Sequence, residues 1–227
     1  MSEIVRLLLT ALQLGDSFFP SGSFAFSWGL EALVHDAAVT DAAKFEAFIE
    51  GQITWRWATT DRVALGHVLR SSEVIASTRE ADEYLDTMML PQELRSGSCR
   101  SGAALLRVHE LLGLEPAAAY RRLVLAGAVP GQLAAVQGLV CNAAGLGLSQ
   151  AVAISGHIFT VSLLGAGIRL GLIGSVAAQR ILTALQPLLA RYAEDAPPGL
   201  DQMHSFAPEA DIAAMRHPNQ AVRLFAN

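Results

Sequence analysis

The chain has 227 residues, of which 52% are hydrophobic and 16% are charged, and this composition excludes a disordered chain because such chains are poor in apolar residues. The net charge of −5 leaves no basic surplus for a nucleic-acid backbone, and two cysteines are too few for the disulfide framework of a small secreted scaffold. The length suits one compact domain, or at most two small ones.

Hydrophobic residues recur at helical spacing along the chain, and no run of strand length alternates β-branched and polar residues. A capping Thr40-Asp41 pair begins one helix, Pro91 ends another and Pro116 opens a third, whereas Pro187 is expected to kink or break the last one. Helices are predicted over residues 4–14, 24–35, 40 toward 69, 73–90, 92–113, 117–126, 131–145, 149–164 and 175–192.

This pattern predicts an all-α fold, with a single compact helical domain of about nine or ten helices over residues 1–199. Pro197-Pro198-Gly199 breaks the helical pattern, so residues 200–227 are expected to form a separate C-terminal tail.

Residues 123–168 contain no charged side chain, which raises the question of membrane helices. Polar residues interrupt this segment throughout, and no stretch reaches the roughly 18 uninterrupted apolar residues of a spanning helix. We therefore favour buried core helices over membrane helices. The N-terminus has an early acidic residue and no typical cleavage site, so it is interpreted as a first helix, and the expected location is the cytoplasm.

Local motifs give little support for catalysis. The sequence contains no HExxH, CxxC, GxSxG or GxGxxG pattern, and its one lysine, Lys44, precedes Phe45, which rules out a P-loop. His157 is interpreted as a hydrogen-bonded core histidine, or alternatively as a ligand or base. Arg95 and Arg100 flank Cys99 in sequence and could lower its pKa, so an enzyme with a Cys/His site in a helical pocket is the alternative hypothesis. No cofactor or metal site is predicted.

Charge is segregated between two neighbouring segments. Residues 71–94 hold six acidic residues and one arginine, whereas residues 95–122 hold five arginines and two acidic residues. The segregation is consistent with an ordinary solvated face. The sharper hypothesis is an arginine-rich face for a protein partner, because guanidinium groups serve interfaces well.

Two terminal regions carry more large apolar side chains than a loop or a chain end usually does. Phe18, Phe19, Phe24, Phe26 and Trp28 crowd a Gly/Ser/Pro-rich segment, and they either fill the core or anchor a partner. The tail carries further apolar residues and arginines beyond a Pro-Pro break, so it either packs back on its own domain or becomes ordered when it binds another protein.

At these two regions the chain resembles the urease accessory protein UreF family. Residues 12–31, LQLGDSFFPSGSFAFSWGLE, are similar to that family's N-terminal LLQL…PxGxFx[YF]SxGLE pattern, and residues 211–225, DIAAMRHPNQAVRLF, are similar to its DIxxMxHxxQxxRLF ending. Segments at 100–107 and 169–180 also resemble family segments in the right order. The departures are local: Ser23, Phe26 and Trp28 replace common family residues, and a usual histidine near Pro130 is missing.

The resemblance implies a non-enzymatic assembly factor, present as a homodimer. It would bind the UreD/UreH accessory protein, recruit the GTPase UreG, and take part in delivering nickel to apo-urease. Apolar anchors and guanidinium forks are the residue types expected at such an interface. The partner-binding residues that we infer are Phe24, Phe26, Ser27, Gly29 and Glu31 from the first motif, Arg100 and Arg107 as residues facing the GTPase, and Met215, Arg216, His217, Gln220, Arg223, Leu224 and Phe225 from the tail.

Overall fold

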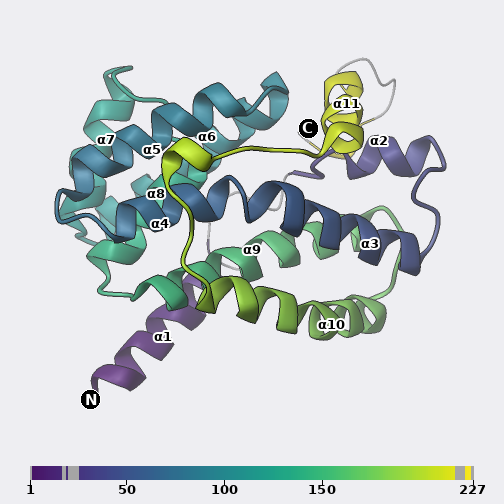
Figure 1. The fold of residues 1–227 in the computed structure, drawn as a ribbon, viewed down its shortest axis with the longest axis horizontal. Coiled ribbons are helices and arrows are strands. Elements are labelled where there is room, and N and C mark those ends of the chain that lie inside the picture. The colour runs from purple at the N-terminus through teal and green to yellow at the C-terminus, as the bar shows by residue number, and fades with distance from the viewer. Residues whose placement is uncertain (1, 17–18, 20–25, 218–222, 226–227) are drawn as a thin grey trace.

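A computed structural model describes residues 2–16, 19, 26–217 and 223–225, and within these ranges the chain is all-α (Figure 1). The described α-helices are α1 Glu3–Gly15, α2 Leu30–His35, α3 Ala42–Gln52, α4 Asp61–Leu69, α5 Val74–Met88, α6 Gln92–Leu111, α7 Glu115–Leu125, α8 Leu133–Ala143, α9 Leu148–Arg169, α10 Ser175–Glu194 and α11 Pro208–Arg216. A π-helical turn, Ile53–Trp57, and a 3₁₀ turn, Leu200–Gln202, complete the described elements.

The predicted fold class is confirmed, although eleven α-helices in the described residues exceed the expected nine or ten. The helix expected over residues 24–35 begins only at Leu30, because Trp28 and Gly29 adopt left-handed backbone angles, φ 55° and 83°. The helix expected to run from residue 40 toward Leu69 is divided by the π-helical turn and Thr60. In contrast, α10 continues through Pro187 without ending.

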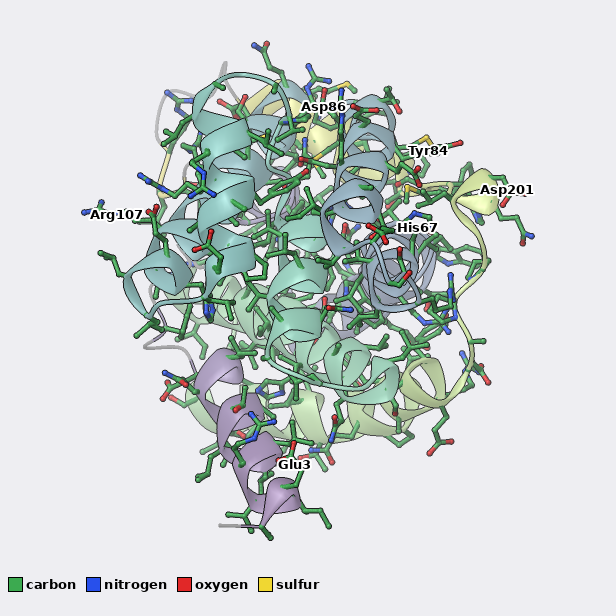
Figure 2. All side chains as sticks on the ribbon, turned by 90° about the vertical axis from the view of Figure 1, so that its left-hand side faces the viewer. Glu3, His67, Tyr84, Asp86, Arg107 and Asp201 are labelled. Atoms are coloured by element: carbon green, nitrogen blue, oxygen red, sulfur yellow. The ribbon has the colours of Figure 1, made fainter. Side chains whose placement is uncertain are left out.

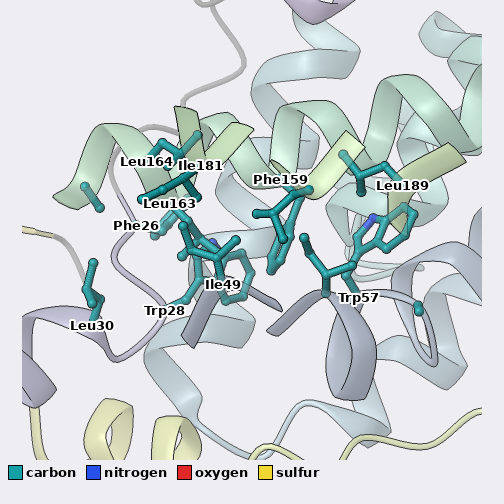
Figure 3. Close-up of a cluster of buried hydrophobic side chains, with 14 of the residues drawn as sticks. Phe26, Trp28, Leu30, Ile49, Trp57, Phe159, Leu163, Leu164, Ile181 and Leu189 are labelled. Atoms are coloured by element: carbon teal, nitrogen blue, oxygen red, sulfur yellow. The ribbon is translucent and has the colours of Figure 1, made fainter. Parts of the chain in front are cut away.

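The largest part of the core forms around α9, which lies beside α10 and beneath α3 (Figure 1). Phe159 of α9 lies between Trp28 and Trp57 (Figure 3), and its ring centroid is 5.7 Å from that of Trp28. The indole Nε1 of Trp57 donates a hydrogen bond to Oγ of Ser155 at 3.2 Å, so this buried polar atom is paired. Trp57 therefore joins the turn after α3 to the central helix.

Helix α9 is the one described helix that is long and apolar enough to cross a membrane by length and composition. Of its most apolar window, 61% is buried inside the protein. This burial is typical of the central helix of a folded domain, and the packing of α10, α1 and α4 against α9 accounts for its apolar composition.

The acidic segment 71–94 is not simply a solvated face, because Asp82 of α5 is fully buried. Its carboxylate accepts hydrogen bonds from the Tyr120 hydroxyl at 2.7 Å and from the backbone N–H groups of Gly131 and Gln132 at 2.8 and 2.6 Å. Burial raises the pKa of Asp82, while these three donors act in the opposite direction. Asp82 thereby fixes the loop that leads into α8.

The chain at and beyond the end of α10 is hydrogen-bonded to side chains of α4 and of its C-terminal end. Arg62 of α4 donates to the backbone oxygens of Tyr192 and Asp195 at 2.9 and 2.5 Å, and Arg70 donates to those of Pro197 and Pro198 at 2.8 and 3.2 Å. The chain then continues through the 3₁₀ turn Leu200–Gln202, which contacts α4. It leads on to α11, which lies next to α2 (Figure 1). The described part of the tail therefore packs back on its own chain.

Candidate functional site

The C-terminal tail meets the N-terminal motif at the carboxylate of Glu31, the first-turn acid of α2. Oε1 of Glu31 accepts a hydrogen bond from the backbone N–H of Leu224 at 2.6 Å, and Oε2 accepts one from that of Phe225 at 3.2 Å. Glu31 is only 8% exposed, so these charge-assisted hydrogen bonds are shielded from solvent. One buried carboxylate thus holds the end of the described chain.

His217 links this carboxylate to α6. Its Nε2 lies 2.8 Å from Glu31 Oε2, and its Nδ1 lies 2.9 Å from Oε2 of Glu93, while the ring itself is fully buried. Only an imidazolium ring donates from both nitrogens, so the protonated form satisfies both carboxylates at once. Arg223 adds a guanidinium group to the cluster, with Nη1 3.3 Å from Glu93 Oε1. We call Glu31, Glu93, His217 and Arg223 the tail lock.

Gly29 allows α11 to approach closely. Its left-handed φ of 83° favours glycine, and a Cβ at this position would lie 2.5 Å from the backbone oxygen of Ala210. Any larger residue would push α11 away from the motif. The glycine therefore serves the contact between the motif and the tail within this chain.

Two further pairs lie at the edge of the tail lock. Nη1 of Arg216 is 2.9 Å from Oδ2 of Asp36, just beyond α2. The ring of Phe225 is 6% exposed and lies 4.2 Å from the guanidinium carbon of Arg169, at the end of α9. The last described residues therefore contact α2, α6 and α9 together.

The structure divides the predicted partner-binding residues into two groups. Phe26, Ser27, Glu31, His217 and Phe225 are buried within the chain, and Gly29 packs against Ala210, so none of these side chains is an exposed anchor here. Phe225 in particular was expected as an apolar anchor, but its ring belongs to the main core cluster. Among the aromatic residues of the first motif, Phe19 and Trp28 are buried as well. Phe18, Phe24 and Gln220 lie outside the described residues.

The exposed group contains Met215 and Leu224, whose exposed fractions are 47% and 58%. Ile212 is 56% exposed and lies one helical turn before Met215 on α11, so these two residues share a face. Two exposed guanidinium side chains accompany these apolar residues, namely Arg216 and Arg223, the second of which also belongs to the tail lock. We call Ile212, Met215, Arg216, Arg223 and Leu224 the tail patch.

Arg100 and Arg107 are both exposed on α6 and lie seven residues apart, which places them on one helix face. The guanidinium carbon of Arg100 is 5.9 Å from the ring centroid of Phe26, so Arg100 also borders the N-terminal motif. Arg107 projects outward at the edge of the molecule (Figure 2). Helix α6 thus carries the Glu93 end of the tail lock and both of these arginines.

Sequence reasoning missed several residues of this site, namely Asp36, Glu93, Arg169 and Ala210. Glu93 was counted only as one acid in the segregated segment 71–94, and Arg169 only as part of a family-like segment. Nothing in their spacing distinguishes them from other residues, because their partners lie more than 50 residues away in sequence.

The groups considered for the enzyme alternative are not arranged as a reaction centre in the described residues. Burial raises the pKa of Cys99 to about 11 and outweighs the expected lowering by Arg95, and burial raises the pKa of Cys141 to about 12. Burial lowers the pKa of His157, which sits against Gly15 of α1. Among the described residues, no group of three or more His, Cys, Asp or Glu side chains could hold a metal ion.

Comparison with known proteins identifies a family and several relatives of similar length. A family model described as UreF matches residues 39–186. The Urease accessory protein UreF of Trichodesmium erythraeum is 34% identical to this chain, covering 96% of each sequence. The proteins of the same name from Corynebacterium efficiens and Cereibacter sphaeroides are 30% and 31% identical, covering 96% and 97% of this chain and 95% and 98% of their own lengths.

The similarity to this class of accessory proteins extends along nearly the whole length of the helical chain. The chain belongs to the UreF family of urease accessory proteins.

Proposed function

We propose that this chain is a non-enzymatic scaffold that binds a UreD/UreH-type accessory protein through the tail patch. Together the two proteins would recruit the GTPase UreG and take part in nickel delivery to apo-urease in the cytoplasm. The observation that supports this proposal is the tail lock. It holds the tail against the body by buried contacts, while Ile212, Met215 and Leu224 remain about half exposed.

Exposed apolar side chains beside guanidinium groups have the composition of a protein interface. A scaffold also needs its docking residues to be positioned in advance, because ordering a free segment on binding reduces affinity. The tail lock provides such positioning, since the N–H groups of residues 224 and 225 are bonded to Glu31.

The test is co-purification of the full chain with UreD/UreH. Removing residues 200–227 is a poor experiment, because Met203, Ala207, Ala213 and Phe225 are buried in that segment and their loss would expose the core. A double variant, Ile212→Ser with Leu224→Ser, changes only exposed side chains. We expect it to bind UreD/UreH at least tenfold more weakly.

Leu125→Ser with Val176→Ser is the matched control, because these two side chains are 68% and 69% exposed on α7 and α10. The control should bind as the unaltered chain does. Equal binding by the tail-patch variant and the control would contradict the proposed interface.

The GTPase contact is proposed to use Arg100 and Arg107, because both are exposed and aligned on α6. Arg107→Glu should retain UreD/UreH and lose UreG from the assembled complex, whereas Arg191→Glu, an exposed arginine on α10, should lose neither. Loss of both partners by Arg107→Glu would instead place Arg107 in the first interface. The mass of the purified chain by light scattering tests the homodimer.

A further inference from the structure

Arg56 is a buried cation at the centre of the molecule, outside the site described above. It belongs to the π-helical turn after α3 and is 4% exposed. Its guanidinium carbon lies 3.7 Å from the ring centroid of Trp28 and 5.7 Å from that of Phe159. Its Nη1 is buried and has no hydrogen-bond acceptor among the described residues. A buried donor of this kind lowers the stability of the fold unless an acceptor forms a hydrogen bond with it.

Two small cavities adjoin Arg56. The inner one, of about 30 Å³, also borders polar side chains of α4, α8 and α9, namely Asp61, Gln137, Ser155 and Ser162. The outer one, of about 20 Å³, borders Thr60, Ser205 and Asp211, the last of which belongs to α11. A buried water needs roughly 10–15 Å³ and two to four polar partners, so each cavity meets both requirements.

Charge decides which ligand fits these cavities. Arg56 interacts electrostatically with both Asp61 and Asp211, and burial raises the pKa of both carboxyls while Arg56 lowers it. Two carboxylates facing one guanidinium leave no positive excess to hold an anion, and the guanidinium disfavours a metal cation. In each cavity, a small neutral molecule that both donates and accepts hydrogen bonds satisfies Arg56 and the carboxyl that borders that cavity.

We infer that Arg56 organises two buried water sites, and that the water in the outer cavity bridges Arg56 to Asp211. Through this bridge the π-helical turn is joined to α11, at a point separate from the tail lock. Because Arg56 also stacks on Trp28, one side chain connects the N-terminal motif, the core and the tail helix. The bridge adds a contact that positions the tail patch, beyond the function proposed above.

The first test uses the unaltered full chain. Its crystal structure, at a resolution that reveals ordered solvent, should contain one or two waters in each cavity, with one within hydrogen-bond distance of Arg56 Nη1. Water-to-amide NOEs at residues 56, 60 and 211 should report the same molecules in solution. Well-ordered surroundings with dry cavities, or density that fits only an anion, would overturn the inference.

The second test is Arg56→Met, which keeps a long side chain over Trp28 and removes the donors. Amide exchange of residues 205–217 should become about tenfold faster, because α11 loses its bridge. Arg191→Met, at an exposed site on α10, is the control and should leave exchange unchanged. Unchanged or slower exchange in Arg56→Met would show that Arg56 does not tie α11 to the core. If this variant does not fold, the solvent structure of the unaltered chain decides.

Discussion

Glu31 lies 2.8 Å from Nε2 of His217, although 186 residues separate the two positions in sequence. In the sequence, the two residues belong to separate motifs near opposite ends of the chain. Their contact makes the two ends one structural unit, in which α2, α6 and the residue after α11 share one hydrogen-bonded cluster. Changes at either end are therefore expected to affect the other.

Glu31→Gln should loosen the tail while leaving the helical body folded. The neutral amide can't satisfy His217 and the two backbone donors of residues 224 and 225 as the carboxylate does. Removing one member of a buried charged network costs about 2–4 kcal/mol of unfolding free energy. Urea denaturation measures this loss, and amide exchange at residues 223–225 should accelerate in parallel.

Glu50→Gln is the matched control for this change, because Glu50 is exposed on α3. It should alter the unfolding free energy by less than about 0.5 kcal/mol. A Glu31→Gln chain as stable as this control would mean that the tail lock does not hold the tail in solution.

Substitutions at the neighbouring residues Leu224 and Phe225 should have different effects, one on binding and the other on stability. Phe225→Ala removes a ring that is 6% exposed and is expected to cost about 2–4 kcal/mol in unfolding free energy. Leu224→Ala removes a side chain that is 58% exposed, so stability should change by less than about 1 kcal/mol, whereas binding to UreD/UreH should weaken. Thermal unfolding and co-purification of both variants check this separation. A destabilised Leu224→Ala chain would contradict it.

Two glycines should respond differently to the same substitution. A Cβ at Gly102, in α6, would overlap the backbone oxygen of Gly131, while a Cβ at Gly51, in α3, would meet nothing within 4 Å. Gly102→Ala should therefore destabilise the chain by about 2–4 kcal/mol through overpacking against a fixed backbone. Gly51→Ala should be neutral or stabilising by up to about 1 kcal/mol, because alanine favours helix. Denaturant midpoints compare the two variants, and equal midpoints would refute the close approach of α6 to the loop at Gly131.

Cys99 should react slowly with alkylating reagents near neutral pH. Burial raises its pKa to about 11, so the folded chain keeps the thiol protonated and forms thiolate only as the pH rises toward that value. At pH 8 the thiolate fraction is then about one in a thousand, far below that of an ordinary cysteine. Mass spectrometry after iodoacetamide treatment measures the rate at Cys99, with the urea-unfolded chain as reference. Comparable rates in the folded and unfolded chains would revive the hypothesis of a reactive cysteine.

Helical periodicity, together with the residues that begin and end helices, predicted the fold class and most helix positions. The apolar stripe of a helix is visible in the local sequence, so it predicts the helices from 73–90 onward to 175–192 closely. Thr40-Asp41 likewise predicted the start of α3, where Asp41 accepts a hydrogen bond from the N–H of Lys44. The left-handed turn at residues 28–29 and the division of the helix before Leu69 were missed, because packing of Trp28 and Trp57 in the core outweighs helix propensity there.

The sequence alone thus determined an all-helical protein and identified its two terminal motifs, since both depend on short-range patterns. Only the tertiary structure decided that the motifs bind each other, that Glu31 and His217 are buried, and that Met215 and Leu224 remain exposed. Hydrogen bonds and ion pairs act across a few ångströms of space, whatever the separation in sequence. The partners of Glu31 and Arg56 therefore could not be known until the helices were packed.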